Sequence, residues 1–376
     1  MEYKLGEMIA CNPTVKLEKG EKYNLVDIDS IQVGTRYVKG KELQTFEGKS
    51  GCRFQNGDTV MARITPCLEN GKIAQIQCES EKGFGSTELL VFRGIKDKTD
   101  SDYVFSLMST EYIRNLSANS MSGASGRQRA DLSFIKNIKW DFPSLSVQQR
   151  IASILNNYDK LIHNYQKQIE DLQNIASELY KEWFVRFRFP GHEKATFENG
   201  IPVGWKYEKL ETYADISTGK CNREDAEEDG LFPLFDRSQE IKKSNSWIKD
   251  CEAIIVPGEG TSFIPRYFKG KFNLHQRCYC VEPKQENMGK FLFFLLMLNR
   301  HYFLSVATGA TVPSLRYNNF AKMKFLLPNI DLCFKFNSIA DCIFERIVNL
   351  QKQYDNLSTQ RDYLLPRLMS GKLEVK

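Results

Sequence analysis

Cationic and aromatic side chains gather in three stretches of this chain that contain no Asp or Glu. These stretches are residues 112–130, 260–281 and 287–330. In the second stretch Arg266, Lys269 and Lys271 alternate with phenylalanine and tyrosine. Because lysine and arginine neutralise phosphates, this composition is typical of a nucleic-acid surface. One such stretch is usually an ordinary solvated face. Three stretches, two of them at matched places in an internal repeat, favour a polyanionic ligand.

Five short segments supply the side chains that we expect to contact this ligand. Two are strand ends, one is a basic hairpin, and two are loops rich in Ser, Thr and Gly, whose arginines suit guanine and phosphate. The candidates are Arg63, Thr65, Ser86, Thr87, Ser122, Ser125, Arg127, Arg129, Arg266, Tyr267, Lys269, Lys271, Thr308, Thr311, Ser314 and Arg316. Structural alternatives stay open. Arg63 could form a surface ion pair, Ser86 and Thr87 could have a structural role at a strand edge, and the segment Arg266–Lys271 could be a solvated hairpin without a ligand.

No recognisable catalytic or metal-binding motif accompanies these cations. Gly258–Ser262 lacks the GK[ST] ending of a phosphate loop, and neither Asn12–Thr14 nor Asp141–Pro143 matches the NPPY-like pocket of an amino-methyltransferase. The ten cysteines include no CxxC pair, and the four histidines have no ligand spacing. We therefore expect no catalytic residue, no metal and no cofactor in this chain.

The sequence predicts a cytoplasmic protein without membrane association. The N-terminus lacks the basic and apolar segments of a signal peptide. The longest apolar run, Phe291–Leu298, is eight residues long, and a helix needs about 20 to cross a bilayer. The scattered cysteines suit a reducing compartment.

Two segments share one heptad pattern and predict two long helices. QKQIEDL begins at Gln166 and QKQYDNL begins 185 residues later, at Gln351. Ten positions in each segment follow alternating steps of four and three, and Arg361 is the one that is not apolar. We call these positions the seam. They include Ile151, Tyr158, Ile162, Ile169, Leu172, Leu179, Ile343, Ile347, Leu350, Leu357 and Leu364.

The repeat predicts an α+β protein with two globular domains that alternate with two helices. We expect globular domains at residues 1–143 and 191–328, and helices within 144–190 and 329–376. The first helix should end near Arg186, and Pro366 should disturb the last turns of the second. In a single chain we expect each seam to pack against the other helix, in an antiparallel coiled coil with a pseudo-two-fold axis. Packing of each helix on its own domain, or pairing between two chains, is the alternative.

Smaller elements recur at matched places in the two halves. In the first half we expect strands at Gly57–Ile64, Ser86–Gly94 and Phe134–Pro143, and a helix at Asp102–Asn115. In the second half we expect strands at Ala253–Gly258 and Arg277–Pro283, and a helix around Phe291–Leu298. Ala307–Arg316 should correspond to the Ser120–Ala130 loop, and Phe320–Pro328 to Phe134–Pro143.

Taken together, these features resemble the specificity subunit of a type I restriction-modification enzyme over nearly the whole chain. The matching text is GDTVMARITPCLENGKIAQI, then GFGSTELLVF, then DFPSLSVQQRIASILNNYDKLI, with ATGATVPSLRYNNFAKMKFLLP as the second-half counterpart. Each piece is weakly specific, whereas their order and duplication are strongly specific. One departure is that the first helix opens with Gln148–Ile151, as is common in the family, and the second has Cys333–Phe336 at that place.

The resemblance implies a non-catalytic DNA-binding subunit. It implies one half of a bipartite double-stranded DNA site for each domain, two methyltransferase subunits and restriction-translocase subunits as partners, and S-adenosylmethionine and ATP as cofactors of those partners. The alternatives are a coiled-coil adaptor that binds only protein, and a DNA-modifying enzyme whose motifs are unrecognisable.

Overall fold

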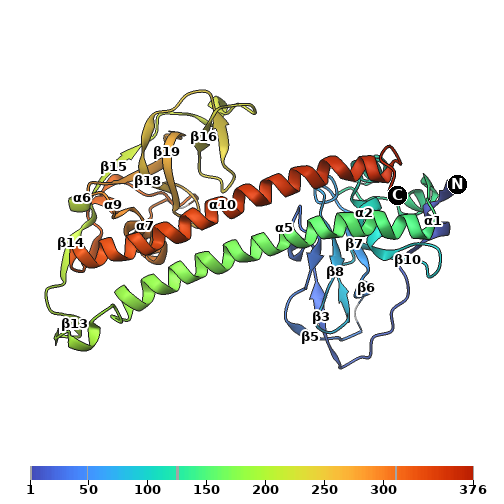
Figure 1. Ribbon diagram of the computed structural model, residues 1–376, viewed down its shortest axis with the longest axis horizontal. Helices are drawn as coiled ribbons and strands as arrows, with labels where there is room; N and C mark the ends of the chain where they lie inside the picture. Colours follow the sequence, from blue (N-terminus) through green and yellow to red (C-terminus); the bar gives the residue numbers. More distant parts are fainter. Residues whose placement is uncertain (1, 49, 124–126, 310, 376) are drawn as a thin grey trace. The chain divides into compact units, whose positions relative to one another are not determined.

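The chain folds into two compact units in a computed structural model that describes residues 2–48, 50–123, 127–309 and 311–375 (Figure 1). Unit 1 combines Met1–Gln168 with Leu350–Lys376, and unit 2 is Ile169–Asn349. Each unit therefore contains a globular α+β part and a section of both long helices. No helix in these described ranges is long and apolar enough to cross a membrane.

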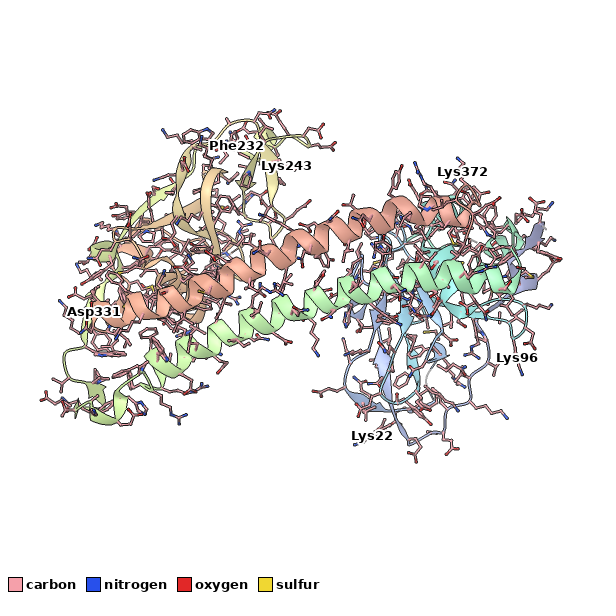
Figure 2. The ribbon with its side chains drawn as sticks, viewed as in Figure 1. Lys22, Lys96, Phe232, Lys243, Asp331 and Lys372 are labelled. Carbon is pink, nitrogen blue, oxygen red and sulfur yellow. The ribbon has the colours of Figure 1, made fainter. Side chains whose placement is uncertain are left out.

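The two predicted long helices are confirmed. α5 spans Leu145–Tyr180 and continues into a wider π-type turn at Lys181–Val185, and α10 spans Ile330–Met369. Asp331 and Lys372 lie near the two ends of α10 in Figure 2. All twenty seam positions are buried or partly buried. α10 continues as a helix past Pro366 to Met369.

Both units contain contacts between the two helices. In unit 1, Leu155 of α5 and Leu368 of α10 share one core, and the Tyr158 hydroxyl donates to Gln360 Oε1 at 3.4 Å. In unit 2, the Tyr180 ring of α5 lies 5.5 Å from the Phe336 ring of α10. Each unit thus joins the beginning of one helix to the end of the other.

Unit 1 stacks two sheets and covers one of them with helices. The five-stranded sheet has the order β2-β10-β7-β8-β4, and the four-stranded sheet has the order β5-β3-β9-β6. Because side chains alternate along a strand, Val60 and Ala62 of β7 lie in the core between the sheets, and Met61 lies in the core beneath the helices. The elements are β1 (Glu2–Lys4), α1 (Leu5–Met8), β2 (Ile9–Cys11), β3 (Lys22–Val26), β4 (Tyr37–Val38), β5 (Leu43–Thr45), β6 (Cys52–Gln55), β7 (Thr59–Ala62), β8 (Ile73–Ile76), β9 (Lys82–Gly85), β10 (Leu89–Gly94), α2 (Ser101–Ser109), α3 (Glu111–Asn119), α4 (Leu132–Asn137) and β11 (Lys139–Asp141), with a short 3-10 turn at Ile28–Ser30.

Unit 2 has one main sheet with the order β15-β20-β18-β19-β16-β17. Phe291 and Phe294 of its apolar helix lie in the largest core together with Phe336 of α10. The elements are β12 (Phe197–Glu198), β13 (Ile201–Pro202), β14 (Lys206–Lys209), α6 (Leu210–Tyr213), β15 (Ala214–Thr218), β16 (Phe232–Phe235), β17 (Lys242–Ser244), β18 (Lys249–Pro257), β19 (Arg266–Leu274), β20 (Cys278–Pro283), α7 (Gly289–Leu298), α8 (Arg300–Val306), α9 (Tyr317–Ala321) and β21 (Lys324–Leu327), with 3-10 turns at His192–Lys194 and Arg223–Asp225.

The two globular parts share one topology, which confirms the predicted internal repeat. Strands β15, β20, β18, β19 and β16 occupy the places of β2, β10, β7, β8 and β4. The single parallel pair in the five-stranded core, β4 with β8, recurs as β16 with β19. The pair β1–β11 recurs as β14–β21. The four-stranded sheet of unit 1 has no such counterpart among the described residues of unit 2.

Two of the smaller predictions are wrong. The helix expected at Asp102–Asn115 is two helices, because Thr110 is extended and its hydroxyl accepts the N–H of Ile113, which caps the second helix. The segment Phe134–Pro143, expected to be one strand, begins with the last residues of helix α4, which Asp131 caps, and only its later part forms a short strand, β11. The matched segment Phe320–Pro328 divides in the same way into the end of α9 and β21.

Candidate nucleic-acid interface

In unit 1, the Ser120–Ala130 loop is fastened to the end of strand β7. The Ala130 N–H donates to the Arg63 carbonyl at 2.8 Å, and the Thr65 N–H donates to the Gln128 carbonyl at 3.0 Å. Ser122 and Arg129 exchange two backbone hydrogen bonds, at 3.2 and 3.0 Å, which close the loop. We call this segment the first anchored loop. It brings Arg63 and Thr65 together with Ser122, Arg127 and Arg129; Ser125 lies outside the described residues.

Unit 2 repeats this arrangement hydrogen bond for hydrogen bond. The Leu315 N–H donates to the Gly258 carbonyl at 2.8 Å, and the Gly260 N–H donates to the Pro313 carbonyl at 3.0 Å. Thr308 and Ser314 exchange two backbone hydrogen bonds, at 3.0 and 2.7 Å. We call Ala307–Arg316 the second anchored loop. The predicted correspondence of the two loops is thereby confirmed.

The second anchored loop exposes several of its predicted contact residues. Thr308, Thr311 and Arg316 are exposed, and Ser314 is half-buried. Arg316 immediately precedes α9, and its N–H donates to Asn319 Oδ1 at 2.6 Å. Its backbone is therefore fixed while its guanidinium is available to solvent.

The first anchored loop contains no Asp or Glu, but folding brings the carboxylate of Glu88 next to it. Glu88, directly after Thr87, accepts two hydrogen bonds from Arg129, at 2.5 Å from Nη2 and 2.9 Å from Nε. The Arg129 guanidinium holds the pKa of Glu88 below its ordinary value. Arg129 therefore has an internal counter-charge, and exposed Arg127 is the loop's better cation for a polyanion. Ser86 accepts the Glu88 N–H at 3.1 Å, which supports its structural alternative.

The second unit has different charges at the same backbone positions. Arg277 stands where unit 1 has Glu88, and Glu259 stands where unit 1 has Ile64. Glu259 accepts from Arg237 at 2.6 Å and lies 3.3 Å from Arg277 Nη1. His275 accepts the Arg277 N–H at its Nδ1, at 3.0 Å, and burial together with Arg237 lowers the pKa of this imidazole. The two units therefore share a backbone frame but present different side chains.

A hollow of about 370 Å³ lies beside the first anchored loop, lined by Arg53, Arg63 and Thr87 together with residues 12–15. The Arg63 Nε is buried and has no hydrogen-bond partner among the described residues, while its Nη2 donates to the Ala130 carbonyl at 3.3 Å. Arg53 stacks on Phe46 with 5.2 Å between guanidinium and ring. Sequence reasoning missed Arg53, because only the pairing of β6 with β9 brings it to this place.

The basic hairpin divides its four candidates between the interior and the surface. Arg266 donates to the carbonyls of Asp236 and Ser238, at 2.5 and 2.8 Å. The Tyr267 hydroxyl donates to Glu252 at 2.5 Å, and burial raises the pKa of this phenol. Both side chains have partners inside the unit, which favours the structural alternative for them. Lys269 and Lys271 are exposed.

A comparison with protein families identifies the larger group to which this chain is related. The model described as the type I restriction modification DNA specificity domain matches residues 1–174 and 202–361. The chain belongs to this family. Type I specificity subunits are non-catalytic components of their complexes, in agreement with the expectation from the sequence.

Individual relatives of this family align with most of the chain. The type I restriction enzyme MjaIX specificity subunit of Methanocaldococcus jannaschii is 28% identical over 318 residues, which are 76% of this chain and 72% of the relative. The MjaVIII specificity subunit of the same organism is 24% identical and aligns with 98% of this chain and 93% of its own length. The crystal structure of a type I S subunit from M. genitalium has the same fold, with a TM-score of 0.59 at 15% identity, and covers 98% of this chain and 96% of that chain.

In this specificity subunit, buried amides attach each globular part to its long helix. In unit 1, Gln148 of α5 accepts the Asp100 N–H at 3.1 Å and donates to the Pro143 carbonyl at 2.9 Å. In unit 2, Asn337 of α10 accepts the Lys290 N–H at 2.9 Å, one turn beyond the matching position, Cys333. The second helix therefore has Cys333 where the first has Gln148, and its amide side chain, Asn337, lies one helical turn later. The Gln148 side chain is fully buried, and its hydrogen bonds go to backbone atoms of its own unit.

Buried charges make a second attachment, in which a cation of the globular part pairs with a carboxylate of the long helix in both units. In unit 1, Arg36 lies 2.7 Å from Asp102 at the start of α2 and 3.0 Å from Asp159 of α5. The seam residue Arg361 of α10 reaches the same Asp159 at 3.1 Å. In unit 2, the cation is Lys290 at the start of α7, which pairs with Asp341 of α10 and, at 3.3 Å, with Glu252.

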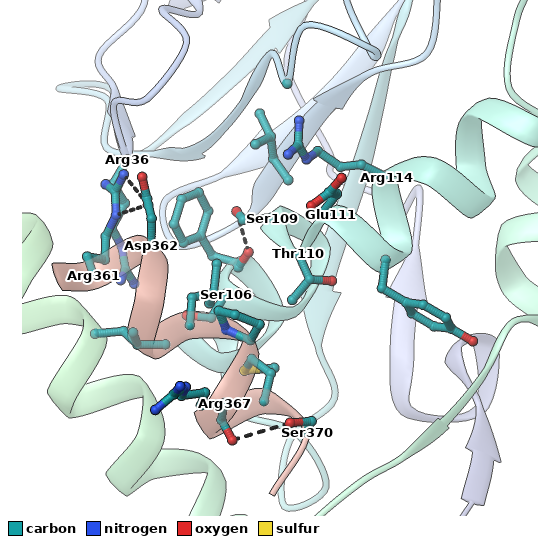
Figure 3. Close-up of a pocket in the computed structure, with 18 of the residues that line it drawn as sticks. Arg36, Ser106, Ser109, Thr110, Glu111, Arg114, Arg361, Asp362, Arg367 and Ser370 are labelled. Atoms are coloured by element: carbon teal, nitrogen blue, oxygen red, sulfur yellow. Dashed lines mark hydrogen bonds and ion pairs between the residues drawn. The ribbon is translucent and has the colours of Figure 1, made fainter. Parts of the chain in front are cut away.

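A larger hollow of about 1230 Å³ in unit 1 adjoins this network. Figure 3 shows Arg361 and Asp362 on the last turns of α10 facing Arg36, with Glu111 and Arg114 of α3 across the hollow. Arg361 donates to Asp362 at 2.8 Å. Acidic and basic side chains alternate around this hollow, whereas a phosphate-binding surface would be mainly basic.

Proposed function

We propose that this specificity subunit recognises a bipartite, asymmetric site in double-stranded DNA, with one half-site for each globular domain. The observation that carries the proposal is the pair of anchored loops, which repeat the same backbone hydrogen bonds but differ in side chains and in charge. A shared frame supports the same mode of docking in both domains, and different side chains support different bases. The proposed domains are residues 1–143 and 191–328, with spacer helices at 144–190 and 329–376.

The proposed DNA contacts combine phosphate binding with base readout. For the first domain they are Arg53, Arg63, Thr65, Thr87, Ser122 and Arg127, and for the second domain Lys269, Lys271, Thr308, Thr311, Ser314 and Arg316. Arginine suits a guanine edge because it can donate two parallel hydrogen bonds, and lysine suits phosphate. Arg129 and Tyr267 are left out because their polar groups already have partners in the protein, and Arg266 because both of its terminal nitrogens donate to backbone carbonyls.

A domain exchange tests the division into half-sites. Residues 195–328 would be replaced by the second domain of another family member, and the methylated sites would be read by methylome sequencing of cells carrying the complete system. We expect one half-site to change and the other to remain. A change in both half-sites, or in neither, would contradict one reader per domain. The incoming domain should carry a cation at position 290, because Asp341 of the retained helix needs it.

We further propose that the chain acts in the cytoplasm and assembles with two methyltransferase subunits and with restriction-translocase subunits. Those partners would use S-adenosylmethionine and ATP. The repeated helix modules support two similar docking surfaces. Mass measurement of the complex with saturating methyltransferase subunit should give two copies per chain, and a one-to-one complex would contradict the proposal.

The adaptor alternative makes a different prediction for the isolated chain. A DNA-binding subunit should bind duplex DNA with an affinity that falls steeply as salt rises, since each neutralised phosphate releases counterions. Absence of DNA binding by both the isolated chain and its methyltransferase complex would favour the adaptor.

A further inference from the structure

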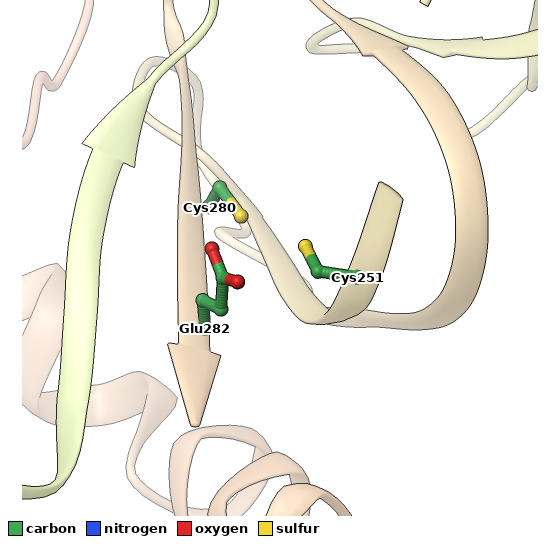
Figure 4. A group of neighbouring side chains, drawn as sticks. All are labelled: Cys251, Cys280 and Glu282. Carbon is green, nitrogen blue, oxygen red and sulfur yellow. The ribbon is translucent and has the colours of Figure 1, made fainter. Parts of the chain in front are cut away.

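Unit 2 contains a cluster of three potential metal ligands that lies outside the proposed DNA contacts. Cys251 is on β18, and Cys280 and Glu282 are on β20. One ligand atom from each of the three lies within 4.8 Å of the other two. Figure 4 shows the Cys251 sulfur directed toward the side chains of Cys280 and Glu282. The cluster cannot be predicted from residue spacing, because its members come from two strands and form no CxxC motif.

The hydrogen-bonded pairing of β18 with its neighbours explains why these side chains meet. Cys280 and Glu282 are two residues apart on β20, so their side chains leave the same face of the sheet. β18 pairs with β20 only from Ile254 to Pro257. Cys251 lies three residues before Ile254, where β18 pairs with β19 alone and its side chain can turn toward β20.

The chemistry of the three groups fits Zn²⁺. Thiolates and a carboxylate are ligands that zinc accepts, with Zn–S distances of about 2.3 Å, which place two sulfurs roughly 3.8 Å apart in a tetrahedron. Lys249 donates to Glu282 Oε2 at 2.7 Å and leaves Oε1 for a cation. Two thiolates and one carboxylate carry three negative charges, which Zn²⁺ and Lys249 together would neutralise.

We propose that Cys251, Cys280 and Glu282 bind one Zn²⁺, with water as the fourth ligand, and that the ion fastens the start of β18 to the end of β20. Cys280 is fully buried and Cys251 is partly exposed, so the site is closed on one side and open to an entering ion on the other. The binding releases the two thiol protons to solvent and changes no oxidation state.

The test uses the reduced, metal-free full-length chain and Co²⁺ as a spectroscopic probe. We expect one equivalent of Co²⁺ to give a thiolate-to-cobalt charge-transfer band with the intensity of two sulfur ligands, and Zn²⁺ to abolish it. Cys251→Ser should lose about half of the band's intensity, and Glu282→Gln should weaken Co²⁺ binding by roughly tenfold or more. Cys342→Ser is the matched control, because Cys342 is an exposed cysteine of α10.

A second measurement avoids variants altogether. Zn²⁺ should slow alkylation of Cys251 in the wild-type chain and leave alkylation of Cys342 unchanged, as read by peptide mass spectrometry. Absence of the cobalt band in the wild-type chain would overturn the proposal. So would a band of full intensity in Cys251→Ser, or alkylation of Cys251 at the same rate with and without Zn²⁺.

Discussion

At the scale of single residues, the proposed interface depends on which arginines keep N–H groups without a hydrogen-bond partner after folding. Arg63 has a buried Nε without a partner among the described residues, while Arg129 is paired with Glu88. Two arginines that look alike in the sequence therefore have different environments. The difference arises from Glu88, which is 41 residues from Arg129 in the sequence.

Arg63→Ala should therefore weaken binding of the cognate duplex far more than Arg129→Ala. We expect roughly 10- to 100-fold weaker binding for Arg63→Ala, about 1–3 kcal/mol, if Arg63 reads a base. Fluorescence anisotropy with duplexes mutated in either half-site should place the loss in one half-site only. Lys96→Ala, which removes an exposed cation of the same unit, is the control. Equal losses for the Arg63 and Lys96 variants would contradict the assignment.

His275 gives a prediction for pH at the same scale. Its folded pKa is below the ordinary value, so the unfolded chain binds a proton more readily than the folded chain. The stability that depends on the neutral ring is present above about pH 6.5 and is lost as pH falls through the folded pKa. Thermal unfolding of the wild-type chain should therefore occur at a lower temperature at pH 5 than at pH 7, and His275→Gln should show a smaller difference. An equal difference in both proteins would assign the effect to other groups.

At the scale of elements, each globular part is joined to its helix by a buried amide and a buried charge network. In both units a cation of the globular part pairs with a carboxylate of the long helix, Arg36 with Asp159 and Lys290 with Asp341. Only the residue at the start of the short helix differs in sign, with Asp102 in α2 and Lys290 in α7. Each pair places opposite charges across the junction between a globular part and its long helix. This complementarity constrains how domains can be exchanged.

Lys290→Met should destabilise unit 2, because it leaves Glu252 and Asp341 without their shared cation. We expect roughly 2–4 kcal/mol, less than for a fully buried pair, since Asp341 is partly exposed. The double variant Lys290→Met, Asp341→Asn should recover part of this loss in denaturant unfolding. Lys372→Met, at an exposed position, is the control. Additive effects of the two substitutions would show that the pair is not coupled.

At the scale of the whole molecule, the seam is the feature that the two units share. Its positions stay buried or partly buried in both helices, and its one charged member, Arg361, pairs with Asp159. We propose that α5 and α10 form a continuous antiparallel coiled coil that sets the distance between the two half-sites. A continuous apolar seam makes such a pair stiff.

Insertion of four residues near Gln173 tests this ruler. The insertion adds about 6 Å to α5, at about 1.5 Å per residue, and roughly one full turn. We expect the same half-sites separated by a spacer longer by one or two base pairs, as read by methylome sequencing. An unchanged spacer with persistent recognition would show that the helices do not set the distance. As a control, insertion of four residues within residues 195–200, outside the two long helices, should leave the spacer unchanged.

The sequence by itself determined the elements whose signal is local or repeated. The heptad spacing specified both long helices, including the positions that are buried, and the matched text specified the duplicated domains. The break at Thr110 was missed because a single N-capping hydroxyl divides an otherwise continuous apolar pattern. The helix α4 was missed because six residues are too few for a periodic signal.

Only the tertiary structure decided which charges meet. The pairing of Arg129 with Glu88, the burial of Tyr267 against Glu252 and the cluster around Cys251 all join residues from different strands or loops. Strand pairing and side-chain direction create these contacts, and neither is encoded in local spacing. Candidate residues could therefore be located by segment from the sequence, whereas their availability to a ligand depends on partners that only the fold supplies.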